Sequence, residues 1–114
     1  MDVDLGKRLF DFAVRVIKLV RTFSSSKEYE VIKYQLVKSA TSSGANYEES
    51  QSASSKAEFK YKIDISLREM RESNYWLRIV KAISISDNKI DELIKESEDL
   101  KKILGSISSK ISRN

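Results

Sequence analysis

Hydrophobic residues recur along most of the chain at intervals of three and four, the spacing that places side chains on one face of a helix. In the first segment this stripe consists of Leu5, Leu9, Phe12, Val16, Val20 and Phe23, and it is widened by Phe10, Ala13 and Ile17. The pattern predicts an amphipathic helix over residues 4–23. Three serines follow at 24–26, where hydroxyls compete for backbone hydrogen bonds, and Ser26 is placed to cap a second helix.

Three further segments keep the same period, and they predict helices over residues 27–52, 55–83 and 88–111. The chain has no proline and only three glycines, which favours long uninterrupted helices. Short connections force consecutive helices to run antiparallel. The predicted fold is therefore all-α, an antiparallel up-down-up-down left-handed four-helix bundle that forms a single domain over residues 1–114.

The stretch SATSSGANYEES, residues 39–50, interrupts the hydrophobic pattern but not its phase. Steps of three and four continue through it, so we expect a helix and not a loop. Small side chains on the buried side of a helix let a neighbouring axis come close. Gly44 is costly within a helix and is expected at a close crossing or a slight bend.

Two additional stripes flank the expected core of the second and third helices. One is polar and consists of Gln35, Ser42, Asn46 and Glu49, whereas the other is mostly apolar and consists of Ile65, Glu69, Glu72, Trp76, Ile79 and Ile83. A long apolar stripe packs against a neighbouring helix or another subunit, and a buried carboxylate needs hydrogen-bond donors. We therefore predict a structural polar network of the six polar residues, with the four apolar ones at a packing surface or interface.

Catalysis is the competing interpretation of the glutamates, because Glu49, Glu69 and Glu72 resemble the carboxylates of metal sites in helical bundles. The di-iron arrangement also requires histidines, and this chain contains neither histidine nor cysteine. An all-carboxylate magnesium or manganese site remains an alternative. No glycine-rich phosphate loop or Ser-His-Asp set is present. We predict a protein that is not an enzyme, with no catalytic residue, cofactor or metal.

Charge makes an acidic partner the leading expectation. The chain carries 21 Lys and Arg against 17 Asp and Glu, a net charge of +4. One face of the first helix holds several of them, namely Lys7, Arg8, Arg15 and Lys18, with Arg21 at its edge. Such a stripe is commonly a solvated face, but repeated around a symmetric oligomer it becomes a surface able to bind the phosphates of RNA or DNA.

The expected location is the cytoplasm. The N-terminal residues lack the apolar core of a secretory signal, and no run of about 18 apolar residues predicts a membrane span. The absence of cysteine fits a reducing compartment.

Two motifs in order carry a family resemblance. QLVKSATSSGANYEES at 35–50 and SLREMRESNYWLRIV at 66–80 resemble the bundle proteins encoded in intervening sequences of bacterial 23S ribosomal RNA genes. The matching positions are Gln35, Leu36, Ala40, Ser42, Ala45, Asn46 and Glu49, then Ser66, Leu67, Glu69, Glu72, Tyr75, Trp76 and Leu77. The chain departs from the pattern at Glu48 and Ser50 and at the serines 24–26.

The resemblance implies a left-handed up-down bundle, often a homopentamer, without catalytic residues. It also implies kinship with accessory subunits of diversity-generating retroelements, in which a basic pentamer engages nucleic acid and a reverse transcriptase. We therefore expect a homo-oligomeric scaffold that binds RNA or DNA through a basic outer face. The alternative is a structural or protein-interaction bundle with no direct nucleic-acid role.

Overall fold

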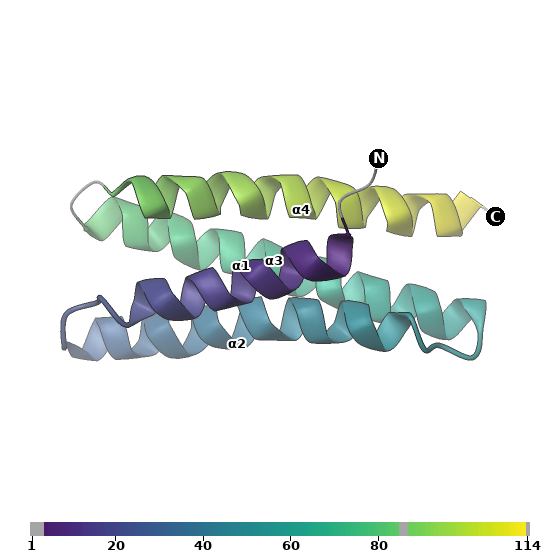
Figure 1. The fold of residues 1–114 in the computed structure, drawn as a ribbon, viewed down its shortest axis with the longest axis horizontal. Helices are drawn as coiled ribbons and strands as arrows, with labels where there is room; N and C mark the ends of the chain where they lie inside the picture. Colours follow the sequence, from purple (N-terminus) through teal and green to yellow (C-terminus); the bar gives the residue numbers. More distant parts are fainter. Residues whose placement is uncertain (1–3, 85–86, 114) are drawn as a thin grey trace.

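In a computed structural model that describes residues 4–84 and 87–113, the chain forms four long helices (Figure 1). They are α1 Leu5–Val20, α2 Lys27–Ser50, α3 Lys56–Ile83 and α4 Asn88–Arg113. Consecutive helices run in opposite directions along the long axis, and α1 and α3 each pack against both α2 and α4. The prediction of an all-α four-helix bundle is confirmed.

Polar caps fix where the helices begin. The side chains of Asp4, Ser26 and Ser55 each accept a hydrogen bond from a backbone N–H in the first turn, at 3.0, 3.2 and 3.0 Å. The ends of α1 and α2 come earlier than the sequence predicts, at Val20 and Ser50, because the backbone beyond them makes single turns to carbonyls three residues back.

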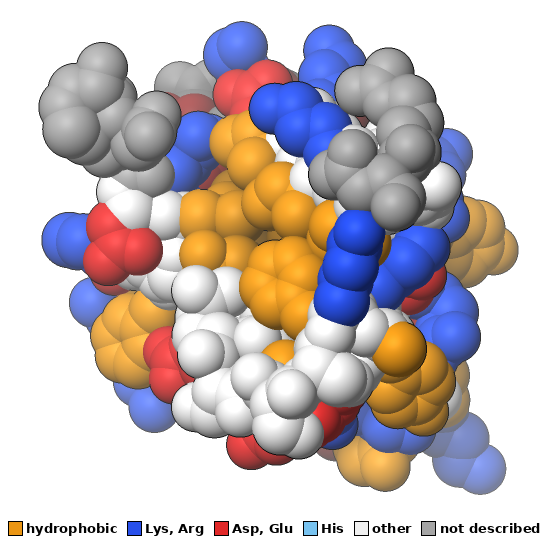
Figure 2. Space-filling view, turned by 90° about the vertical axis from the view of Figure 1, so that its right-hand side faces the viewer, with side chains coloured by type: hydrophobic (Ala, Val, Ile, Leu, Met, Phe, Trp, Pro, Cys, Tyr) orange, Lys and Arg blue, Asp and Glu red, His pale blue; other side chains and the backbone are white. Residues whose placement is uncertain are grey.

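The core is a single apolar cluster drawn from all four helices. Its largest fully buried members are Phe12, Leu9, Leu36, Met70, Leu77, Leu93, Leu100 and Leu104. Figure 2 faces the end formed by the α2–α3 connection and shows hydrophobic side chains in the middle, with Lys and Arg prominent around the rim.

Small residues fill the middle of α2, as the unbroken heptad phase predicts. Ser39 and Ser43 are buried against Ser73 and Ser66 of α3. On the other side of α2, a Cβ added at Gly44 would lie 3.5 Å from the Cβ of Leu9, so α1 crosses closely there. The stretch 39–50 is therefore the closely packed centre of the bundle.

Candidate nucleic-acid interface

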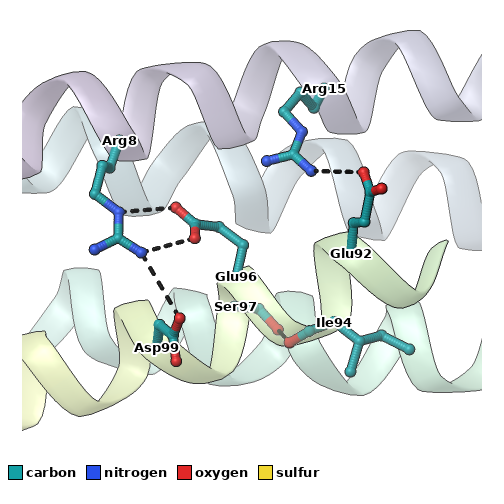
Figure 3. A network of polar contacts seen from close by, with 7 residues as sticks. All are labelled: Arg8, Arg15, Glu92, Ile94, Glu96, Ser97 and Asp99. Carbon is teal, nitrogen blue, oxygen red and sulfur yellow. Dashed lines mark hydrogen bonds and ion pairs between the residues drawn. The ribbon is translucent and has the colours of Figure 1, made fainter. Parts of the chain in front are cut away.

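Two of the basic residues predicted on α1, Arg8 and Arg15, lie along its seam with α4 (Figure 3). Arg8 donates from Nε and Nη2 to the two carboxylate oxygens of Glu96, at 3.0 and 2.7 Å, and its Nη2 is 3.9 Å from Asp99. The hydrogen bond to Glu96 is the main reason that the pKa of Arg8 lies above its usual value. This guanidinium is half-buried and joins two helices.

Two further cations of the predicted stripe also have carboxylate partners. Arg15 Nη2 lies 3.6 Å from Glu92, and Lys7 Nζ lies 2.7 Å from Asp11 in the next turn of α1. The hydrogen bond to Asp11 raises the pKa of Lys7. The charge of these two side chains, like that of Arg8, is therefore partly compensated within the subunit.

Lys18 and Arg21, at the C-terminal end of α1, are exposed and form no ion pair with any residue that the structure describes. Lys18 borders a hollow of about 340 Å³ between α1 and the first turn of α4. The hollow is lined by Arg15, Lys18, Leu19, Thr22, Asp87, Lys89, Glu92 and Leu93. Three cations against two carboxylates suit the binding of a phosphate group.

Sequence analysis missed Lys89 and the α4 carboxylates, because nothing local connects them with α1. A signal was nevertheless present. Glu92, Glu96 and Asp99 are spaced by four and three residues and so share one face of α4. An acidic stripe of this kind can form ion pairs with a basic stripe on a neighbouring helix, and α1 carries that basic stripe.

Within α2, the predicted polar network is represented by one pair. Asn46 Nδ2 donates to the carbonyl and the hydroxyl of Ser42, at 2.9 and 3.1 Å. Glu49 is 68% exposed in its side chain and lies 3.9 Å from Lys62 Nζ. Gln35 is half-buried.

On α3, the two predicted glutamates are half-buried. Glu72 accepts a hydrogen bond from Trp76 Nε1 at 3.1 Å, within the same helix. Burial, and then the neighbouring Glu72 charge, raise the pKa of Glu69 against the opposing effect of Arg68 and Lys38. Among the described residues, no hydrogen bond joins the six predicted network residues across α2 and α3, so a network between helices or subunits stays a prediction.

The predicted apolar stripe of α3 is only partly covered. Trp76 and Ile79 pack on the core with one edge, Ile65 is half-buried, and Ile83 is exposed. For the part of the chain that the structure describes, no group of three or more Asp and Glu residues is arranged to hold a metal ion.

A second uncovered apolar surface lies between α1 and α2. Phe10, expected to widen the core stripe, instead points outward and is 61% exposed, because at 100° per residue it lies at least about 120° around α1 from the buried Phe12 and Val16. It borders a mostly apolar groove of about 350 Å³. The groove is lined by Leu9, Phe10, Ala13, Val14, Ile17, Thr41, Gly44, Ala45 and Glu48. We refer to this surface as the α1–α2 groove.

Comparisons with known proteins agree with this architecture. A solved structure of a protein of unknown function from the S23 ribosomal protein family of Bacteroides thetaiotaomicron is similar, with 30% sequence identity and a TM-score of 0.84. The likeness covers 92% of this chain and 98% of that one. None of the curated proteins matches. Over residues 4–84 and 87–113, no helix has the length and apolarity to cross a membrane.

The family model described as 23S rRNA-intervening sequence protein matches residues 1–106. The match includes both motifs, at 35–50 and 66–80, and all of α1, α2 and α3. The resemblance noted in the sequence is thereby confirmed, and the chain belongs to the 23S rRNA-intervening sequence protein family.

Proposed function

We propose that this protein is a non-enzymatic scaffold that assembles with copies of itself and binds RNA or DNA through its basic outer face. The observation that carries the binding part is the cluster of cations around the hollow between α1 and α4. Lys18, Lys89 and Arg15 converge there, and Arg21 lies one turn from Lys18.

Self-association is supported by two apolar surfaces, the α1–α2 groove and the apolar stripe of α3, a helix that packs on α2. The α1–α2 groove and the α3 stripe belong to adjacent sides of the bundle. When two different patches of one subunit bind each other, the contact is head-to-tail, and it closes into a ring if the rotation fits. Two surfaces on adjacent sides of the subunit suit a ring of few subunits, such as the pentamer implied by the family resemblance.

The heights of the two patches along the bundle match. Gly44 lies beside Leu9 of α1, and its neighbour Ser43 lies beside Ser66 of α3. Phe10 in the groove and Ile65 in the stripe are therefore at about the same height. A rotation axis parallel to the helices preserves height, so Phe10 of one subunit meets Ile65 of the next.

Assembly is tested by light scattering of Phe10→Glu, which places a charge in the proposed interface. Since Phe10 is mostly exposed in the subunit, the variant should fold normally but lose mass relative to the wild type. Ser106→Glu, at an exposed position of α4 outside the two patches, introduces the same charge and is the control that should keep the wild-type mass. A wild-type protein that is monomeric at micromolar concentration refutes self-association.

Nucleic-acid binding is tested with a duplex RNA hairpin over a salt series. Lys18→Glu combined with Arg21→Glu should weaken binding and make the dependence of log K on log salt shallower by roughly 1.5 to 2. Lys95→Glu with Lys102→Glu, on the exposed side of α4, changes the net charge equally and is the control. Absence of binding at low salt, or equal losses in both variants, contradicts this proposal.

The second candidate is a protein-interaction bundle, and the exposed α1–α2 groove favours it. In this case the groove receives an apolar helix of another protein, for example a reverse transcriptase as in the retroelement bundles that the chain resembles. A complex that survives nuclease and high salt, and that Phe10→Glu abolishes, would favour this function over nucleic-acid binding.

A further inference from the structure

We propose that the outward face of α3 binds a single-stranded stretch of nucleic acid, with bases stacked on tyrosines and phosphates held by arginines. The residues are Tyr61, Arg68, Arg71, Tyr75 and Arg78, called here the Tyr–Arg strip, which is distinct from the apolar stripe of α3. This inference adds to the proposed function a surface away from α1, and it rests on the part of that function that concerns nucleic acid.

The positions on α3 place these side chains in one line. Tyr61, Arg68 and Tyr75 are spaced by seven residues, and Arg71 and Arg78 flank the line. At 100° per residue, all four others lie within about 60° of Tyr75 around the helix, and the strip is about 26 Å long. All five side chains are exposed. Aromatic rings along a cationic track are the arrangement by which proteins bind single strands without reading their sequence.

Tyr75 is held as a platform and is 48% exposed. Its ring packs nearly perpendicular to that of Trp76, with centroids 5.2 Å apart and planes at 76°. The guanidinium carbon of Arg78 lies 5.8 Å from the centroid of the Tyr75 ring, within the range of a cation–π contact. These contacts fix the ring while leaving about half of it open to a base.

A buried amide orients Arg78. Asn74 is only 3% exposed, and its Oδ1 accepts a hydrogen bond from Arg78 Nε at 2.9 Å. Its Nδ2 donates to Ser97 Oγ of α4, also at 2.9 Å. This chain of hydrogen bonds runs from the core to the surface. The terminal nitrogens of Arg78 form no ion pair with any residue that the structure describes, so they are free to bind a phosphate.

The carboxylates on the same face have other contacts. Asp64 receives hydrogen bonds from Lys60 Nζ at 2.7 Å and from the Ser108 hydroxyl, and Glu72 receives one from Trp76. In contrast, Arg68, Arg71 and Arg78 form no ion pair with any described residue. The strip therefore keeps a positive charge beside its aromatic rings.

The experiment compares a fluorescent oligouridylate of about 10 nucleotides with the duplex RNA hairpin. Because stacking of one base contributes about 1–3 kcal/mol, Tyr75→Leu should weaken oligouridylate binding by roughly 5- to 150-fold and leave hairpin binding unchanged. Tyr75→Phe keeps the ring and should bind as the wild type does. Tyr34→Leu, at a tyrosine of α2 that is 64% exposed, is the control.

The variants also separate this inference from the proposed function. Lys18→Glu with Arg21→Glu should reduce hairpin binding more than oligouridylate binding, and Arg68→Gln with Arg71→Gln should do the reverse. Oligouridylate binding that Tyr75→Leu leaves intact overturns the inference. A wild type that binds the hairpin but not the oligouridylate also overturns it, while the proposed function stands.

Discussion

Ser43 of α2 and Ser66 of α3 each donate a hydrogen bond to the backbone carbonyl of the other, at 2.9 and 2.7 Å. Both side chains are completely buried. The two helix backbones are close enough for a hydroxyl to span them, and any larger side chain would push them apart. This exchange explains why serines occupy heptad positions that usually carry leucine.

The serine contacts predict two different outcomes in double-mutant cycles. Ser43→Ala and Ser66→Ala should each lower the free energy of unfolding by about 1 kcal/mol. Because each hydroxyl donates to a carbonyl that the other substitution leaves in place, the coupling should be small, although the two hydroxyl oxygens are 3.2 Å apart. Urea unfolding of the two single variants and the double variant measures the coupling.

Ser39 and Ser73 provide the contrasting pair, since their hydroxyls bond each other at 2.8 Å. Replacing either one by alanine removes that bond for both, so we expect a coupling of at least about 0.5 kcal/mol. Equal coupling in the two pairs would show that the hydroxyl partners differ from those described.

Two helical glycines predict a second contrast. A Cβ at Gly105 meets nothing within 4 Å, so Gly105→Ala should stabilise the protein by about 0.5–1 kcal/mol through helix propensity. Gly44→Ala should be equally favourable, since its Cβ meets Leu9 at the ordinary distance of 3.5 Å. Gly44→Leu should instead cost about 1–3 kcal/mol by overpacking against α1. Thermal unfolding of the three variants, compared with Gly105→Leu, checks the order.

The pKa of Glu69 predicts a pH dependence. Its pKa in the folded protein is raised above 4.5, so protonated Glu69 favours folding, and this contribution is lost as the pH rises through the folded pKa. The stability of Glu69→Gln relative to that of the wild type should therefore increase as the pH rises from about 4 to about 7. Urea unfolding across that range measures the difference, and a difference that is constant with pH would contradict the raised pKa.

Asp64 on the same helix predicts the opposite sign. Burial raises its pKa, but hydrogen bonds from Lys60 and Ser108 outweigh burial and hold the pKa below 3.8. The stabilising contribution is present above 3.8 and is lost as the pH falls through the folded pKa. Asp64→Asn should thus be destabilised at neutral pH, and the gap to the wild type should close in acid.

The Arg8–Glu96 contact predicts a measurable coupling between α1 and α4. It is bidentate and half-buried, so the cycle of Arg8→Met and Glu96→Gln should give about 1 kcal/mol. The exposed Lys7–Asp11 pair within α1, which solvent screens, should give a smaller coupling. A coupling as small as that of the exposed pair would mean that α4 does not hold Arg8.

Sequence periodicity was sufficient for the four helices and for the packed serine stretch, because both depend on spacing along one helix. The prediction that Phe10 widens the core stripe was wrong, because at 100° per residue Phe10 lies at least about 120° from Phe12 and Val16. Periodicity could not show that Arg8 faces a carboxylate 88 residues away. The cations of α1 were identified, but their compensation by α4 is a tertiary property.

The placement of the α1–α4 seam also has a consequence for kinetics. The α1–α2, α2–α3 and α3–α4 contacts join neighbouring helices through short connections, whereas the seam joins the two ends of the chain. The loop closure that forms the seam costs the most entropy, so we expect the seam to form after the transition state of folding. Loss of the Arg8–Glu96 contact should then accelerate unfolding and leave the folding rate almost unchanged. The same contact that joins the ends of the chain would thus set the lifetime of the folded bundle more than the speed of its formation.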